Sequence, residues 1–379
     1  MASISAVPRV LLAFEPPDGG VAENVALLAL HLRAHGFEPE VAGPESALPY
    51  PRLEEAGVPV HRMPLVRSTG DVRSHRAALA ALERLLAVGS FSVVHAHSAK
   101  AGVLVRVAAR RRSTPAVYSP HCFAFVGPVS RARQVLATAV ERRLGRETAA
   151  IVCSCEAERR RALERRVGRP ERLHRVYYGV ENCPNGRLAD PTLNEMARGG
   201  PLVGAVSVLR EQKRLDLLVD AAPRVLERAP EARVAIVGNG PLRDELQAQA
   251  RALGLDRHER FAMLPFEPPA SRYLGALDLY VLPSAWEAMP IGALEALACG
   301  VPQIVTDVEG TREAVEHGRT GILLPPDGRG LADAVVDLLA DEPRRRAMAE
   351  ASRARQRERF DVDRMAAETA AVYERAIAG

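Results

Sequence analysis

The amino-acid sequence predicts an α/β protein of two domains, each built around a parallel β-sheet. Its 379 residues exceed what one small hydrophobic core requires. Short apolar runs alternate with amphipathic helical segments along both halves, which favours strands separated by crossover helices. Residues 181–200 lose this periodicity and gather proline and glycine, as linkers do. We therefore expect a first domain at 1–180, a linker at 181–200, a second domain at 201–360 and a final helix at 361–379.

The first half opens with an apolar strand from Arg9 to Phe14, a Gly19-Gly20 pair and a helix from Val21 to Ala34. Further strands are expected at 40–42, 58–63, 92–95, 116–119 and 149–154, with helices at 73–88, 99–112, 130–144 and 156–167. Ligands of a parallel sheet bind beyond the carboxyl ends of its strands. The Gly pair, the segment from His97 to Gly102 and the loop at His121 all follow strand ends. The Gly pair either admits a ligand close to the backbone or marks a tight turn.

The segment at 281–302 carries the most chemistry. Its sequence, VLPSAWEAMPIGALEALACGVP, predicts a strand end, an irregular loop and a helix from Ile291 to Cys299. Pro290 suits a first turn, and Gly300 suits a left-handed C-cap. The helix start leaves N–H groups at Ile291, Gly292 and Ala293, which favour a bound phosphate.

Glu287 and Glu295 flank this phosphate seat. Carboxylates would repel phosphate directly, but they would accept hydrogen bonds from hydroxyl groups on either side of a diphosphate. A sugar at one end and a ribose at the other fits that description. The alternative is that both are solvated carboxylates of an ordinary strand-loop-helix unit.

Arg210 and Lys213 are the candidate cations of the second half. They follow the strand predicted at 202–209 and open a helix expected to run to Arg228, so both could reach one anion. Cations at a helix start oppose the helix dipole unless an anion is bound there. The only lysines of the chain are Lys100 and Lys213, which suggests that a compact ammonium is needed at these positions.

The Glu-x7-Glu pattern within E-A-M-P-I-G-A-L-E-A-L-A-C-G-V-P resembles the signature of retaining glycosyltransferase family 4. The R-x-x-K at Arg210 and Lys213 is similar to the family's donor-diphosphate clamp, and H-S-x-K-A-G followed by P-H-x-F resembles its polysaccharide-type members. The resemblance implies a GT-B fold of two facing Rossmann-like domains with a cleft between them. It also implies that the final helix returns to the first domain.

By this resemblance, Arg210 and Lys213 would hold the diphosphate, Glu287 the sugar hydroxyls and Glu295 the ribose. His121 would lie near the transferred sugar. The remaining donor contacts would come from Met289, Pro290, Ile291, Gly19 and Gly20. His97 and Lys100 would face the acceptor or cap the helix at Ala99. Two departures affect local geometry: Cys122 replaces the glycine usual after the histidine, and Glu309 and Arg312 replace glycine and proline in the turn at 307–313.

The resemblance implies transfer of a hexose-type sugar from a nucleoside diphosphate, with UDP favoured by its frequency in the family, to a hydroxyl group. The acceptor would be a glycan, a lipid-linked saccharide or a small natural product. The reaction would retain the anomeric configuration and need neither metal nor cofactor. Two alternatives share the architecture: a sugar-nucleotide epimerase, and a sugar-nucleotide binding subunit without catalysis.

Composition narrows the remaining classes. The chain has no apolar run of membrane-spanning length and no signal-peptide pattern, so we expect a cytoplasmic protein. No dinucleotide fingerprint and no nucleic-acid-binding motif occurs. Basic residues crowd between Arg106 and Arg175. They indicate either contact with an anionic membrane, at its inner face, or with an acidic acceptor, or else solvated helix faces balanced by nearby glutamates. The five cysteines predict buried, reduced thiols, and no metal-ligand cluster is visible.

Overall fold

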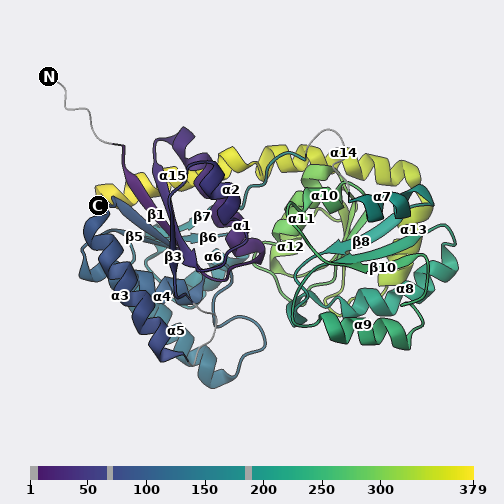
Figure 1. The fold of residues 1–379 in the computed structure, drawn as a ribbon, viewed down its shortest axis with the longest axis horizontal. Coiled ribbons are helices and arrows are strands. Elements are labelled where there is room, and N and C mark those ends of the chain that lie inside the picture. The colour runs from purple at the N-terminus through teal and green to yellow at the C-terminus, as the bar shows by residue number, and fades with distance from the viewer. Residues whose placement is uncertain (1–6, 66–70, 184–189) are drawn as a thin grey trace. The chain divides into compact units, whose positions relative to one another are not determined.

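The structure, a computed structural model, describes residues 7–65, 71–183 and 190–379 and divides into two compact units. Unit 1 comprises the chain up to Gly179 together with Val362–Gly379, and unit 2 comprises Val180–Asp361. The final helix thus belongs to unit 1 (Figure 1). Of the segment expected as a linker, residues 184–189 lie outside the described residues, and a helix, α7, spans Pro191–Arg198.

Unit 1 is a parallel α/β unit. Its strands are β1 (Arg9–Phe14), β2 (Glu38–Pro44), β3 (Val60–Met63), β4 (Val93–His97), β5 (Ala116–Ser119), β6 (Ala150–Cys153) and β7 (Leu173–Arg175). Its helices are α1 (Gly19–His31), α2 (Tyr50–Glu55), α3 (Val72–Val88), α4 (Ala99–Arg111), α5 (Arg131–Gly145), α6 (Glu156–Glu164) and α15 (Val362–Ala378), with 3₁₀ turns at Leu32–His35 and Pro170–Arg172. The strand order is β3-β2-β1-β4-β5-β6-β7, with every pair parallel.

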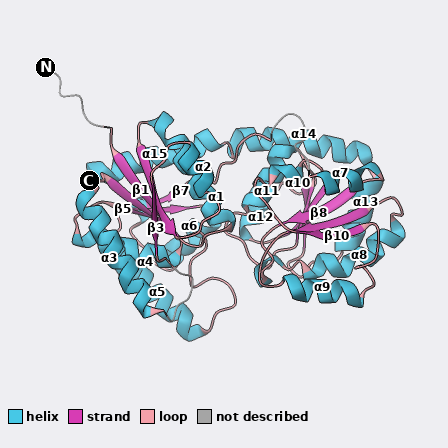
Figure 2. Cartoon of the chain, in the orientation of Figure 1, coloured by secondary structure: helices cyan, strands magenta, loops and turns pink. Residues whose placement is uncertain are grey.

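Both faces of this sheet are covered, which explains why its strands are apolar throughout. Helices α3, α4 and α5 lie on one side and α1, α2 and α15 on the other (Figures 1 and 2). The central strand β1 is fully buried from Val10 to Phe14. Helix α3 starts where its sequence predicts, because the Asp71 carboxylate accepts a hydrogen bond from the Ser74 amide at 2.9 Å.

Helix α15 is fastened to the sheet by a buried histidine. His95 Nδ1 and the Tyr373 hydroxyl share a hydrogen bond of 2.6 Å, and His95 Nε2 lies 2.8 Å from Ser119 Oγ. Tyr373 is fully buried and also packs edge-on against Phe37. This polar bridge joins the last helix to β4 and β5 within unit 1.

Unit 2 repeats the architecture on a shorter sheet. Its strands are β8 (Leu202–Val206), β9 (Arg233–Val237), β10 (Phe261–Leu264), β11 (Leu279–Leu282), β12 (Gln303–Thr306) and β13 (Gly321–Leu324). Its helices are α7, α8 (Asp216–Arg228), α9 (Arg243–Ala252), α10 (Ser271–Leu274), α11 (Ile291–Cys299), α12 (Glu309–Ala314), α13 (Leu331–Ala340) and α14 (Glu342–Arg359), with a 3₁₀ turn at Glu211–Lys213. The strand order is β10-β9-β8-β11-β12-β13, again all parallel.

Two expectations are wrong in unit 2. The helix expected from Arg210 begins only at Asp216, because the residues before it form a 3₁₀ turn that Arg214 ends in the left-handed conformation. The dipole argument for Arg210 and Lys213 therefore does not apply to α8. The cysteines are not all reduced: Cys183 and Cys299 form a disulfide across 116 residues, whereas Cys122, Cys153 and Cys155 are not disulfide-bonded.

Acid is expected to weaken unit 1. Burial lowers the pKa of His95, His97 and His121 below 6.5, that of His121 to about 3. Below pH 6.5 the unfolded chain therefore binds more protons than the native one, so the free energy of unfolding falls as the pH drops toward 3. Each histidine should contribute a slope of about 1.4 kcal/mol per pH unit inside its window. Urea unfolding followed by circular dichroism at several pH values measures this slope.

Two variants control that measurement. His95→Gln removes one titrating group, so the slope of the unfolding free energy against pH should fall by the contribution of one histidine. His317→Gln, at an exposed position of unit 2, should leave the slope unchanged. The same slope in both variants and in the wild type would contradict the linkage.

The disulfide is expected to stabilise unit 2. Cross-linking Cys183 to Cys299 restricts the unfolded chain over a long loop, so Cys183→Ser should lower the free energy of unfolding by roughly 2 to 5 kcal/mol under non-reducing conditions. Cys122→Ser, which breaks no disulfide, is the control. Urea unfolding followed through Trp286, the single tryptophan of the chain, measures the change. Non-reducing peptide mapping that finds no link between the two cysteines would refute the pairing.

Candidate functional site

Helix α11 forms the centre of the candidate site in unit 2. It follows the loop after β11 and spans Ile291–Cys299, the range that its sequence predicts. Pro290 occupies the N-cap rather than the first turn, with extended backbone, and Gly300 ends the helix in the left-handed conformation. Glycine thus stops the helix for the reason expected, whereas proline precedes the first turn instead of occupying it.

The helix start offers fewer amides than predicted. The Ala293 amide donates to the Pro290 carbonyl at 3.0 Å and is therefore engaged, which corrects the expectation that it is open. The amides of Ile291 and Gly292 come too early in the helix to reach a carbonyl of the same helix. The helix start therefore keeps two amides directed out of the helix.

Lys213 and Glu287 form the central ion pair. Lys213 Nζ donates to Glu287 Oε1 at 2.5 Å, and the Glu287 side chain is only 6% exposed. A carboxylate buried to this extent requires a charged or hydrogen-bonding partner. The structure thus brings together two residues that the sequence placed in separate motifs 74 residues apart.

Two residues that were not predicted complete the environment of Glu287. Ser284 Oγ donates to Glu287 Oε1 at 2.8 Å. The side-chain amide of Gln212, through Nε2, donates to the Trp286 carbonyl at 2.8 Å and lies 3.4 Å from Glu287 Oε2. The Ala285 amide in turn donates to the Gln212 carbonyl at 2.8 Å, which ties the two loops together. The sequence signals for them are weak: Gln212 adjoins Lys213, and Ser284 lies three residues before Glu287.

The helix start lies over a buried tyrosine. Burial, and then the charges of Glu295 and Glu287, raise the pKa of Tyr280, so its hydroxyl stays protonated and donates to the Val206 carbonyl at 3.3 Å. Glu295 itself is half-buried in the second turn of α11. At Gly292 a Cβ atom would lie 2.7 Å from the Tyr280 hydroxyl, so only glycine fits without displacement there.

The turn at 307–313 keeps one essential glycine despite its departures from the family pattern. The Gly310 amide donates to the Glu287 carbonyl at 3.2 Å. A Cβ atom at Gly310 would lie 1.9 Å from the Ala288 carbonyl oxygen, so no side chain fits. Arg312 forms an ion pair with Asp307 at 2.7 Å. The start of α12 therefore packs closely against the Glu287 loop.

The candidate residues of unit 1 form a hydrogen-bonded chain. His97 Nδ1 and His121 Nε2 are 2.8 Å apart, and His121 Nδ1 shares a hydrogen bond with the Tyr178 hydroxyl. His97 is 1% exposed, so the residue expected to face an acceptor is buried behind His121. These side chains line a small cavity, of about 10 Å³, that also reaches Asn24 and Ser154.

The loop at His121 has an unusual backbone that a buried glutamate supports. His121 and Cys122 adopt φ angles of 51° and 88°, a region that non-glycine residues seldom occupy. Glu158 accepts hydrogen bonds from the Cys122 amide at 2.8 Å and from the Ser154 amide at 2.7 Å. Burial raises the pKa of Glu158, and these amides act in the opposite direction. Glu158 was predicted only as part of a solvated, charged helix face.

The other predicted positions are placed as follows. Gly19 and Gly20 open α1 after the short loop that follows β1, and Gly19 has a φ of 74°. Lys100 is half-buried in the first turn of α4. Met289, Pro290 and Ile291 are buried around the start of α11. Arg210 precedes the 3₁₀ turn that carries Lys213, and its carbonyl accepts from the Lys213 amide at 2.9 Å.

Within the residues that the structure describes, no group of three or more His, Cys, Asp or Glu side chains is arranged to hold a metal ion. No helix in the same ranges combines the length and the apolar character needed to cross a membrane. In the basic stretch, Arg106 is buried against Glu141 at 2.9 Å, and Arg159 pairs with Glu156, so part of that charge is balanced internally.

Comparison with known proteins shows the family to which the chain is related. A family model described as "Glycosyl transferase 4-like domain" matches residues 19–179, and one described as "Glycosyl transferases group 1" matches residues 194–355. The D-inositol 3-phosphate glycosyltransferase of Kribbella flavida is 30% identical over 295 residues, which cover 73% of this chain and 69% of that protein. The phosphatidyl-myo-inositol mannosyltransferase of Mycobacterium leprae is 29% identical over 378 residues, which cover 96% and 94%.

A solved structure with the same fold is Anabaena Alr3699/HepE in complex with UDP and glucose. It has a TM-score of 0.79 at 21% identity, and the match covers 96% of this chain and 98% of that one. Together, the two family models account for both units, and the relatives extend over most of the sequence. The chain therefore belongs to the family 4 glycosyltransferases and has their GT-B fold.

Proposed function

We propose that this glycosyltransferase moves a hexose-type sugar from UDP to an acceptor hydroxyl, with retention of the anomeric configuration and without a metal ion. The observation that carries the proposal is the ion pair of Lys213 and Glu287 beside the start of α11. A cation, a buried carboxylate and two amides of the helix start come together in this part of unit 2. These are the groups that a nucleoside diphosphate sugar requires.

Lys213 has capacity left for a phosphate. An ammonium group has three donors, and the described residues engage one of them, at Glu287 Oε1. The other two N–H groups can bind phosphate oxygens, together with Arg210 and the Ile291 amide. Because the negative charge on the diphosphate increases as the sugar leaves, these fixed donors stabilise the transition state more than the ground state.

Glu287 has capacity left for a sugar. Its Oε1 is occupied by Lys213 and Ser284, whereas among the described residues Oε2 has only the long contact to Gln212 at 3.4 Å. Oε2 can therefore accept a hydrogen bond from a donor-sugar hydroxyl. Glu295, in the second turn of α11, would accept from the ribose. No carboxylate is assigned as a covalent nucleophile, so the acceptor attacks the face from which the diphosphate departs and transfers its proton to the leaving phosphate.

His121 would contribute a neutral imidazole near the transferred sugar. Its pKa of about 3 keeps it uncharged at neutral pH, so it offers hydrogen bonds rather than charge. Tyr178 and His97 hold both ring nitrogens in this structure. A sugar hydroxyl would therefore have to exchange with, or share, one of these partners.

The names of similar proteins support the donor base and the kind of acceptor. The solved neighbour was crystallised with UDP and glucose, which supports a UDP-hexose donor. One relative is named for a phosphatidyl-myo-inositol acceptor and another for an inositol phosphate. We therefore propose an acceptor that carries a lipid or a phosphate, and a cytoplasmic reaction next to the inner membrane face.

Replacing Lys213 should abolish most of the transfer. Lys213→Ala removes a donor to the leaving diphosphate, so we expect kcat to fall by about 10²- to 10³-fold. Arg214→Ala is the matched control, because this neighbouring cation pairs with Asp216 instead. UDP release from UDP-glucose in the presence of an acceptor measures both. If Lys213→Ala keeps more than a tenth of wild-type turnover while folded by circular dichroism, Lys213 does not serve the reaction.

The product should retain the anomeric configuration of the donor, and chelation should not slow its formation. Proton NMR of the reaction identifies the new anomeric signal, and the rate with EDTA gives the metal dependence. An inverted product or a rate lost on chelation and restored by a divalent cation would contradict the mechanism. The same spectra test the alternatives, because an epimerase converts the donor without an acceptor and a binding subunit leaves it unchanged.

A further inference from the structure

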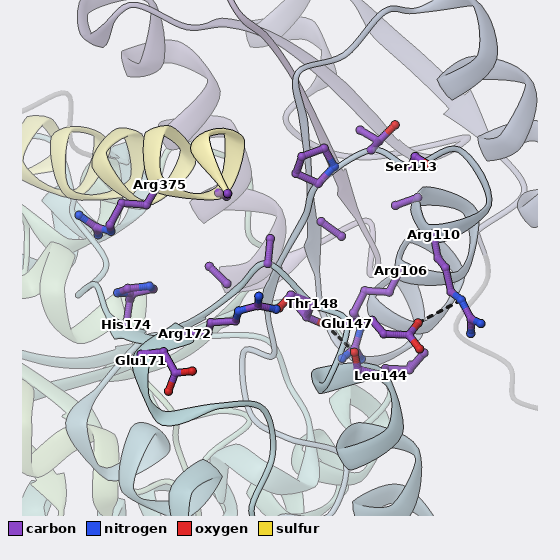
Figure 3. A pocket seen from close by; sticks show the side chains of 18 residues that line it. Arg106, Arg110, Ser113, Leu144, Glu147, Thr148, Glu171, Arg172, His174 and Arg375 are labelled. Carbon is purple, nitrogen blue, oxygen red and sulfur yellow. Dashed lines mark hydrogen bonds and ion pairs between the residues drawn. The ribbon is translucent and has the colours of Figure 1, made fainter.

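A second pocket lies in unit 1, at the amino edge of the sheet. It has a volume of about 600 Å³ and is lined by the starts of β5, β6 and β7 and by the ends of α4, α5 and α15 (Figure 3). His97 and the loop of His121 follow the opposite, carboxyl ends of β4 and β5. The pocket is therefore distinct from the residues proposed for sugar transfer. Its size is within the range of small-molecule sites.

The lining is rich in cations. Four arginines and one histidine line the pocket, against two glutamates: Arg106, Arg110, Arg172, Arg375, His174, Glu147 and Glu171. Glu147 is already paired with Arg110 at 3.1 Å and with Arg143, which lies outside the lining. In Figure 3, Arg172 and Thr148 lie between His174 on one side and Arg106 with Glu147 on the other.

Two of the arginines lack a carboxylate partner. Arg172 donates to the Thr148 carbonyl at 3.1 Å, and neither it nor Arg375 has an ion pair within the described ranges. His174 is half-buried, and burial followed by the charge of Arg375 lowers its pKa. The imidazole and this guanidinium therefore lie within electrostatic reach of each other. Such an arrangement favours an anion over water.

The inner wall adds a buried donor. Arg106 is 4% exposed, with its guanidinium 3.8 Å from the centre of the Tyr118 ring. Nε donates to the Gly102 carbonyl and Nη2 to Glu141, whereas Nη1 finds no acceptor among the described residues. A buried donor without a partner is unusual, because it loses its bonds to water. The wall thus supplies an unsatisfied N–H group on a positively charged side chain.

We propose that this pocket binds a small phosphate-bearing molecule, of up to about sugar-phosphate size, at a site separate from the donor site. The planar guanidinium groups of Arg172 and Arg375 would each present two N–H groups to phosphate oxygens, with His174 as a further donor. Helices α4, α5 and α15 all end near the pocket, and their carbonyl ends carry partial negative charge. The arginines could therefore serve to stabilise these helix ends instead of binding phosphate, and the experiment has to distinguish the two roles.

Calorimetry with inorganic phosphate and with glucose 6-phosphate tests the proposal. The full chain carries Arg210→Ala and Lys213→Ala, so that phosphate bound at the proposed donor site is removed. We expect one saturable site per chain for each probe. In the same background, Arg172→Ala with Arg375→Ala should weaken binding at least tenfold. Arg84→Ala, at an exposed position of α3 in the same unit, should leave the affinity unchanged.

Glu171→Gln is a second variant that does not depend on removing an arginine. Glu171 is an exposed carboxylate of the lining without an ion pair in the described residues, so its neutralisation should tighten phosphate binding several-fold. No saturable binding, or affinities unchanged by both Glu171→Gln and the double alanine variant, would overturn the proposal and leave the arginines to the helix ends.

Vesicles of phosphatidylglycerol provide the last arm, because a lipid headgroup offers the same phosphate chemistry. Binding to vesicles that requires Arg172 and Arg375, without binding of either soluble probe, would overturn a small-molecule site in favour of a membrane contact. Vesicle binding that is absent or indifferent to the two arginines, together with saturable glucose 6-phosphate binding, is the expected result.

Discussion

The contact between Lys213 and Glu287 constrains the candidate site of unit 2. A carboxylate as buried as Glu287 is unfavourable without a cation, so the 3₁₀ turn of Lys213 has to reach the loop that precedes α11. The bond from the Ala285 amide to the Gln212 carbonyl holds the two loops at this distance. Ser284 and Gln212 then orient the carboxylate, and the Gly310 amide fixes its backbone. Loss of most of these contacts would expose the Glu287 carboxylate or leave it buried without a partner.

Unit 1 organises its polar residues in the opposite way. Burial keeps three of its histidines, His95, His97 and His121, neutral, and hydrogen bonds rather than ion pairs link them to their neighbours. Two series of hydrogen bonds result. One runs from Tyr373 through His95 to Ser119, and the other from His97 through His121 to Tyr178. One half of the enzyme thus contributes charge and the other contributes neutral donors and acceptors. This division suits a reaction in which one substrate is a polyanion and the other supplies a hydroxyl.

The sequence correctly predicted the features that depend on local signals, such as a proline or glycine at a helix end. Helix α11 has the predicted bounds because proline and glycine define both ends, and Glu287 and Lys213 were named from their motifs. The start of α8 was wrong, because periodicity does not separate a 3₁₀ turn with a left-handed residue from the first turn of a helix. Strand β7 was missed, since Leu173–Arg175 is short and two of its three residues are polar. The disulfide joins cysteines 116 residues apart, a pairing that no local pattern indicates.

Glu158 has a consequence for how variants of this enzyme are interpreted. It lies 36 residues from Cys122 in sequence, yet it accepts hydrogen bonds from the amides of Cys122 and Ser154. These bonds support the unusual backbone conformation at His121 and Cys122. A genetic screen for lost activity would score this glutamate as essential and, because it is acidic, suggest that it transfers a proton. Its hydrogen bonds indicate a structural role instead. Loss of Glu158 would impair the enzyme because the loop at His121 would change conformation.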